Sequence, residues 1–114
     1  MNSSLQGSLA ETQAADYLVR KGHKLIARNF RAVGGEIDLV TLENKTLVFV
    51  EVKQRQNLDS AAYAITSKQQ QRLIRGAECF IRNNQKYQGF DLRFDAILIT
   101  LPFQIRHIKN AWTA

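Results

Sequence analysis

The chain has 114 residues, 45% of them hydrophobic, and a formal net charge of +6 at pH 7. A chain of this length is expected to form one domain, residues 1–114, and to bury roughly two thirds of its unfolded surface. No apolar run approaches the roughly 20 residues of a membrane span, and no signal-peptide pattern is visible, so a soluble cytoplasmic protein without membrane contact is expected. The single cysteine, Cys79, excludes an internal disulfide and a thiolate zinc site. The excess of Lys and Arg favours a polyanionic partner such as nucleic acid.

The first predicted elements are a helix over residues 7–21 and an outer strand over residues 24–30. Glu11 shares a helix face with the small residues Ala14 and Ala15, and this face is expected to pack on the core. A glutamate on an inward face needs a polar or charged partner. Periodicity leaves equally open that Glu11 lies on the surface, at the edge of this face.

A hairpin is predicted next, because two β-rich runs, residues 36–42 and 46–53, flank the polar break at residues 43–45. A two-residue turn at Asn44-Lys45 and a four-residue loop give the same register. The expected pairs are Leu42 with Leu47, Val40 with Phe49, Asp38 with Glu51, and Glu36 with Lys53. A loop of odd length would instead put the carboxylates on opposite faces.

In this register two carboxylates, Asp38 and Glu51, lie side by side on otherwise apolar strands, with Lys53 next to them. Like charges directly opposite destabilise a sheet, and burial increases the cost. A divalent cation with oxygen ligands would offset that cost. Protonation of one carboxylate, or neutralisation by Lys53, would offset it without a metal.

Residues 54–65 lack periodicity and predict a long loop. A second helix is predicted to begin at Thr66 or Ser67, each of which has a glutamine three residues later as a capping-box partner. Basic residues recur along one face of this helix: Lys68, Arg72, Arg75 and Arg82. This stripe is either a solvated surface or a series of phosphate contacts, which position a nucleic acid without reading its sequence.

The last part of the chain predicts a strand over residues 92–101, a break at Pro102 and an edge strand over residues 104–109. His107 has no second histidine or cysteine at ligand spacing, so a structural or surface role is expected. Trp112 is expected to pack the end of the chain against the domain.

The complete pattern is a helix with Glu11, a strand, a hairpin with Asp38 and the tripeptide Glu51-Val52-Lys53, a helix and a strand. It resembles the αβββαβ core of the PD-(D/E)-x-K nuclease superfamily. Glu11 matches the helix glutamate of the archaeal Holliday-junction resolvase branch. The phrases Gly-Gly-Glu-Ile-Asp-Leu-Val, Phe-Val-Glu-Val-Lys and Phe-Asp-Ala-Ile resemble the bacterial YraN-like family, over nearly the whole chain.

The resemblance implies an α/β fold with a central mixed sheet flanked by helices. It also implies a metal-dependent endonuclease that hydrolyses phosphodiester bonds in DNA, with structure-specific cutting of branched or junction DNA as one option. Asp38, Glu51 and the Val52 carbonyl would hold Mg²⁺, which Mn²⁺ could replace, and Glu11 would bind the ion directly or through water. Lys53 would orient the attacking water or stabilise the charge that develops on the phosphate.

The nucleic acid itself is expected to contact a set of basic and amide side chains: Arg55, Lys68, Gln69, Arg72 and Arg75. A symmetric junction would call for a homodimer, which the edge strand after Pro102 could mediate. The alternative function is a non-catalytic nucleic-acid-binding module with the same fold. Such a module would need the basic stripe but not the carboxylates.

Overall fold

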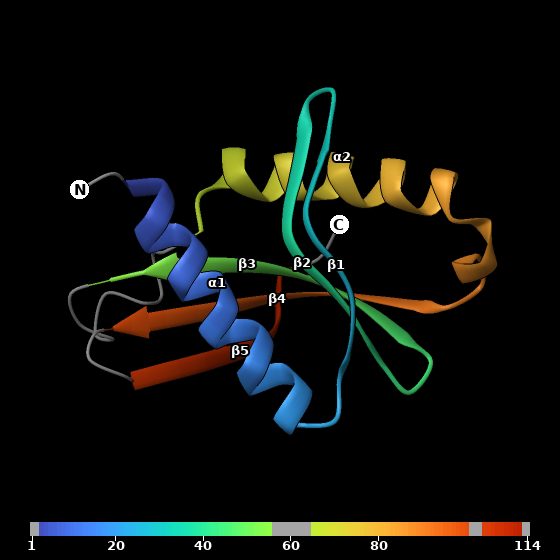
Figure 1. Ribbon diagram of the computed structural model, residues 1–114. Helices are drawn as coiled ribbons and strands as arrows, with labels where there is room; N and C mark the ends of the chain where they lie inside the picture. Colours follow the sequence, from blue (N-terminus) through green and yellow to red (C-terminus); the bar gives the residue numbers. More distant parts are fainter. Residues whose placement is uncertain (1–2, 56–64, 101–103, 113–114) are drawn as a thin grey trace.

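Five strands form one mixed sheet, and two long helices cover its opposite faces (Figure 1). The computed structural model describes residues 3–55, 65–100 and 104–112. The elements in chain order are α1 (Ser3–Arg20), β1 (Lys24–Ala32), β2 (Gly35–Glu43), β3 (Thr46–Gln54), α2 (Ser67–Asn83), the 3-10 helix η2 (Gln85–Tyr87), β4 (Asp91–Thr100) and β5 (Gln104–Trp112). Most of the predicted 54–65 loop, and Pro102, lie outside the described residues.

The strands lie in the order β1-β2-β3-β4-β5, and each neighbouring pair is antiparallel except β3 with β4. The parallel pair follows from the connection, because α2 returns the chain to the starting end of β3 before β4 begins. The predicted α/β fold, with a mixed sheet between helices, is therefore confirmed. In the part of the chain that the structure describes, neither helix combines the length and apolar character needed to cross a bilayer.

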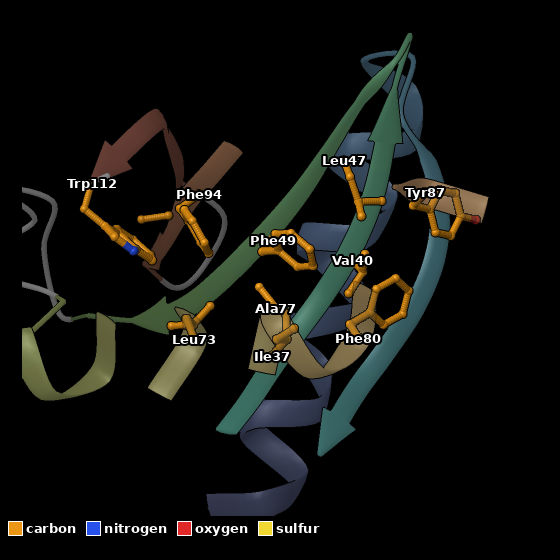
Figure 2. Close-up of a cluster of buried hydrophobic side chains, with 11 residues drawn as sticks. Ile37, Val40, Leu47, Phe49, Leu73, Ala77, Phe80, Tyr87, Phe94 and Trp112 are labelled. Atoms are coloured by element: carbon orange, nitrogen blue, oxygen red, sulfur yellow. The ribbon is translucent and has the colours of Figure 1, made fainter. Parts of the chain in front are cut away.

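Two cores lie on the two faces of the sheet, since successive residues of a strand point to opposite sides. On β3, Val48 and Val50 join Ala14 and Leu18 of α1. Leu47 and Phe49 join the core under α2, with Leu73, Ala77 and Phe80. Figure 2 shows this second core, with Ala77 and Phe80 directed toward the sheet residues Val40 and Phe49.

Helix α2 begins as its sequence predicts. The Thr66 hydroxyl accepts a hydrogen bond from the Gln69 backbone N–H at 3.1 Å, and the Gln69 side chain accepts one from the Thr66 N–H at 3.0 Å. These reciprocal bonds satisfy backbone donors that the first turn of a helix leaves free. The capping box therefore fixes the residue at which α2 begins.

The turn between β2 and β3 is the two-residue form, Asn44-Lys45, with Asn44 at φ +55°. The predicted pairs of Leu42 with Leu47 and of Val40 with Phe49 are confirmed.

The other two predicted pairs, Asp38 with Glu51 and Glu36 with Lys53, are wrong. Backbone pairing between β2 and β3 in the described chain ends at Leu39 with Val50. Beyond that point β2 remains paired only with β1, so the two strands leave the sheet together.

Strand β2 departs from the sheet at Asp38, where the alternation of its side chains between the two faces breaks. Ile37 packs in the core under α2 but Leu39 packs in the core under α1, although two residues along a regular strand share a face. The alternation therefore breaks between them. On β1, Asn29 lies between the residues that pair with Leu39 and Ile37, and its φ of +51° is left-handed. The hairpin bends here and rises across α2 (Figure 1).

The bent hairpin rests directly on the helix backbone. A Cβ atom added at Gly35 would lie 2.4 Å from the Gly76 nitrogen, far closer than a Cβ atom can approach. The close approach thus requires a glycine at this position of β2.

Asp95 of β4 is the centre of a buried polar network on the same sheet. Its carboxylate accepts two hydrogen bonds from the Arg93 guanidinium, at 2.8 and 3.0 Å, and one from the Asn110 N–H at 3.0 Å. His107 Nε2 lies 2.7 Å from the same carboxylate. The Tyr17 hydroxyl lies 3.3 Å from His107 Nδ1. Of the two roles expected for His107, structural or surface, the structural one is confirmed.

Candidate active site

A cavity of about 190 Å³ opens where β2 has separated from β3. Its walls come from α1, β2, β3 and α2: Glu11, Glu36, Asp38, Glu51, Val52, Lys53, Gln69 and Arg72. All four residues predicted to be catalytic, and all four predicted to hold a metal, line this single cavity. The separation of the strands makes the cavity, because a continuous ladder would have closed it.

The Asp38 side chain replaces a backbone hydrogen bond that continued pairing of β2 with β3 would have made. Its Oδ2 accepts a hydrogen bond from the Val52 N–H at 2.8 Å. A backbone amide that loses its ladder partner needs another acceptor, and this carboxylate supplies it. Asp38 therefore joins the two strands through its side chain and reaches Glu51 without the predicted backbone pairing.

The Glu51 carboxylate is largely buried, with 13% of its side chain exposed, and Lys53 Nζ lies 3.6 Å from its Oε1. Burial, followed by a hydrogen bond with Asp38 and the negative charge of Asp38, raises the pKa of Glu51 to about 9. Lys53 lowers the pKa, but by less than these effects raise it. Near neutral pH the two carboxylates therefore share a proton, which a bound cation could replace.

Glu11 points inward from α1, as one of the two sequence-based alternatives predicts. Arg28 of β1 lies 3.8 Å from its carboxylate, and the Asn29 side chain hydrogen-bonds to it. Burial and the charge of Asp38 raise the pKa of Glu11, and the contacts with Asn29 and Arg28 lower it in part. Glu11 is thus held at the cavity wall by β1, within electrostatic range of Asp38.

These acidic side chains do not close into a complete metal cage. Within residues 3–55, 65–100 and 104–112, no three acidic, histidine or cysteine side chains converge as a metal site would require. Mg²⁺ nevertheless needs only one or two carboxylates, since it keeps several waters and takes phosphate oxygens as further ligands. The adjacent pair Asp38 and Glu51 meets that smaller requirement.

The rim of the cavity is formed by an ion pair between β2 and α2. Arg72 lies 2.6 Å from the Glu36 carboxylate, and half of the Arg72 side chain is exposed. Glu36 therefore pairs with Arg72 and not with Lys53. Gln69, in the first turn of α2, lines the same rim.

Three of the predicted nucleic-acid contacts lie away from the cavity wall. Arg55 donates a hydrogen bond to the Gln54 carbonyl at 2.8 Å. Lys68 and Arg75 are exposed on α2. Of the predicted contact residues, only Gln69 and Arg72 line the cavity.

Sequence reasoning missed the contribution of β1 to this site, namely Arg28 and Asn29. A signal was available for Asn29, because asparagine is depleted in strands and tolerates positive φ. A register count along the first hairpin would also have put Asn29 beside Asp38.

The fold and the cavity define a class of protein. It is an α/β domain in which carboxylates and a lysine cluster where two neighbouring strands separate. The chain belongs to the Uncharacterised protein family UPF0102, whose family model matches residues 10–99. This span contains every residue that lines the cavity. The resemblance to the YraN-like family is confirmed at this level.

Individual relatives carry the same family name. Over 108 residues the chain is 46% identical to a UPF0102 protein of Nitrobacter winogradskyi, covering 95% of this chain and 92% of the relative. A UPF0102 protein of Rhodopseudomonas palustris strain BisB18 is 47% identical over 95% of this chain and 80% of its own length. One from Bradyrhizobium diazoefficiens is 44% identical, with 95% and 81% covered.

Proposed function

We propose that this protein is a metal-dependent endonuclease of the PD-(D/E)-x-K superfamily that hydrolyses phosphodiester bonds in DNA. One observation carries the proposal. Side chains from a helix and two strands, up to 42 positions apart in the chain, line one cavity: Glu11, Asp38, Glu51 and Lys53. Buried acids with strongly shifted pKa values in a cleft are a recurrent property of catalytic sites.

The donor set fits Mg²⁺, with Mn²⁺ as a substitute. Asp38, Glu51 and the Val52 carbonyl would hold the ion, and Glu11 would bind it directly or through water. When bound, the ion would lower the pKa of an attacking water and offset negative charge on the scissile phosphate. Without a cation, the Asp38 and Glu51 pair holds a proton instead, as the raised pKa of Glu51 indicates.

Lys53 is the residue suited to act on the reacting phosphate or water. Its side chain is mostly buried, and its ammonium group lies 3.6 Å from Glu51. An ammonium group in a partly water-excluded site can donate hydrogen bonds to a nucleophilic water or stabilise the developing charge on phosphate oxygens. Its contact with Glu51 holds it at the cavity wall, ready for either role.

The basic residues of α2 would hold the substrate backbone. Arg72 is half exposed at the rim, and Lys68 and Arg75 are exposed on the same helix. Contacts of this type supply affinity and register without sequence preference. The match of Glu11 to the resolvase branch supports branched DNA as the substrate form, and a symmetric junction would call for a homodimer through β5.

A second candidate is a non-catalytic nucleic-acid-binding module. It is favoured by the absence, among the described residues, of three converging metal ligands, and by the engagement of Glu11 with Arg28. Such a module would bind nucleic acid equally well with and without Mg²⁺.

Cleavage of a small substrate panel tests the proposal. The full chain is incubated with linear duplex, single-stranded, flap and four-way-junction DNA in Mg²⁺ or Mn²⁺. The variants Asp38→Ala and Lys53→Ala are compared with Glu78→Ala, which removes an exposed acid on α2 outside the cavity. Loss of cutting in the first two variants alone supports the nuclease. Salt-sensitive binding without cutting supports the module instead.

A further inference from the structure

The outer part of the first hairpin, residues 30–37, forms an arm that projects beyond the sheet and lies across α2 (Figure 1). We refer to these residues as the hairpin arm. The arm belongs to the same strands that carry Asp38 and Asn29, so it begins directly at the cavity. Its turn is formed by Val33 and Gly34, with Gly34 at φ +75°.

The hairpin arm is held in place by contacts with α2. Gly35 meets the Gly76 backbone with no room for a Cβ atom. Phe30 packs edge-on against Phe80, with ring centroids 5.3 Å apart. The ion pair between Glu36 and Arg72 joins the two elements at the rim of the cavity. The arm is therefore a preorganised projection, and a partner that binds its tip meets it already ordered.

The tip of the arm is apolar and its sides are basic. Val33 is fully exposed. Arg31 is exposed and pairs directly with Glu36, so both side chains lie on one face of the hairpin. Glu36 lines the cavity, which puts Arg31 on the cavity side. On the helix side, Arg75 lies next to Gly34.

Distance ties the tip to the same bound substrate. Four residues of extended strand, from Gly34 to Asp38, span roughly 13 Å. Stacked nucleic acid rises about 3.4 Å per nucleotide step, so the tip lies about four steps from a phosphate held at Asp38. Within a continuous duplex the flat faces of the bases are covered by their neighbours. An apolar side chain reaches a base face only where stacking is interrupted.

We propose that the hairpin arm recognises branched nucleic acid: Val33 packs against a base exposed where strands diverge, and Arg31 and Arg75 bind the flanking phosphates. The positive charge on both sides of the tip selects a polyanion over a neutral partner. This inference rests on the proposed function for its substrate and adds a residue, Val33, that discriminates branched from linear forms.

Binding without cleavage tests the hairpin arm separately from the chemistry. Fluorescence anisotropy of the full chain is measured in EDTA with a labelled four-way junction and with a linear duplex of the same sequence. Val33→Ser is compared with Val19→Ser, which changes another exposed valine, on α1 and 52% accessible. Val33→Ser should weaken junction binding about three- to tenfold, since full burial of a valine is equivalent to roughly tenfold in an equilibrium constant. Duplex binding should change less than twofold.

A second variant examines the charge. Arg31→Ala should weaken binding to both forms and reduce the salt dependence by about one counterion, as a lost phosphate contact would.

The outcomes separate the two proposals. Selective loss of junction binding in Val33→Ser, in a protein that cuts no substrate, supports the hairpin arm and overturns the nuclease. Equal behaviour of Val33→Ser and Val19→Ser overturns the hairpin arm even when the wild type cuts DNA. A wild type that binds neither form overturns both proposals.

Discussion

Two acidic centres lie on neighbouring strands of this sheet, one fully buried and the other largely buried, and their surroundings differ. Asp95 of β4 is inaccessible to solvent but receives hydrogen bonds from a guanidinium, a backbone amide and an imidazole. Burial raises its pKa, but these bonds and the Arg93 charge lower it by more, so the pKa of Asp95 is about 2. Glu51 of β3 has the carboxylates of Asp38 and Glu36 and the ammonium group of Lys53 as charged neighbours, and its pKa rises to about 9.

Burial alone therefore does not identify a functional acid, since both residues are largely or fully buried and the number of hydrogen-bond donors around them differs. Donors saturate Asp95, so this residue stabilises the fold and leaves little capacity to bind anything else. At Asp38 and Glu51 negative charge exceeds the available donors, which costs stability unless a proton or a cation is bound. Sites that violate the rules of stable packing in this way are where function is expected.

The largest effect is expected from removal of Asp95, the acid whose hydrogen-bonding capacity is filled by donors. Asp95→Ala leaves Arg93 and His107 without their buried acceptor, and breaking such a pair costs about 3–5 kcal/mol. The free energy of unfolding from urea titration measures the loss. Asp91→Ala, which removes an exposed acid on the same strand, should change it by less than about 0.5 kcal/mol. Equal effects of the two variants would contradict the structural role of Asp95.

Acid titration examines the same residue without mutation. The pKa of Asp95 is lower in the folded state, about 2, than its ordinary value of 3.8. Its contribution is therefore complete above about pH 4 and is lost as pH falls through 2, a difference of about 2 kcal/mol. The stability of Asp95→Asn should fall less steeply across this window. A wild-type profile that matches that of the variant would refute the assignment.

Substitution of Glu51 is expected to change the free energy of unfolding in the opposite direction from substitution of Asp95. Glu51→Gln replaces a buried carboxyl group that must carry a proton at pH 7 with a neutral amide of similar shape. We expect the free energy of unfolding to rise by about 1–2 kcal/mol in metal-free buffer, while any nuclease activity is lost. Glu78→Gln, at an exposed site, is the matched control. Destabilisation by Glu51→Gln would show that the carboxylate is satisfied in the folded protein.

The smallest expected effect is that of the cation itself. Mg²⁺ at about ten times its Kd should stabilise the wild type by about 1.4 kcal/mol through binding linkage. Asp38→Asn should not respond, whereas Asp95→Asn should respond as fully as the wild type. Thermal denaturation with and without Mg²⁺ measures both. Equal stabilisation of wild type and Asp38→Asn would place the ion outside the cavity.

The features that sequence predicted correctly depend on residues close together in the chain. The Asn44-Lys45 turn, the register from Val40 to Leu47 and the cap at Thr66 follow from local chemistry. The inward direction of Glu11 is only one of the two positions that helical spacing with Ala14 and Ala15 left open, and the structure decides between them.

The bend at Asp38 could not be predicted in the same way. Ile37 and Leu39 are both apolar, and a regular strand would bury both on one face. In the structure each finds apolar cover, but from different helices. The identity of the two residues carries no information on this choice, since it depends on where α1 and α2 pack. The network around Asp95 escaped prediction because His107 and Asn110 come from β5.

The contact between Gly35 and Gly76 fixes the width of the cavity mouth. Because backbone meets backbone there, with no side chain between, the separation of hairpin and helix is set by van der Waals contact between backbone atoms. A methyl group at Gly35, as in alanine, would force β2 away from α2. It would also separate the Glu36 carboxylate from the Arg72 guanidinium, which now lie 2.6 Å apart. The width of the cavity mouth therefore depends on the lack of a side chain at Gly35, a residue that does not itself line the cavity.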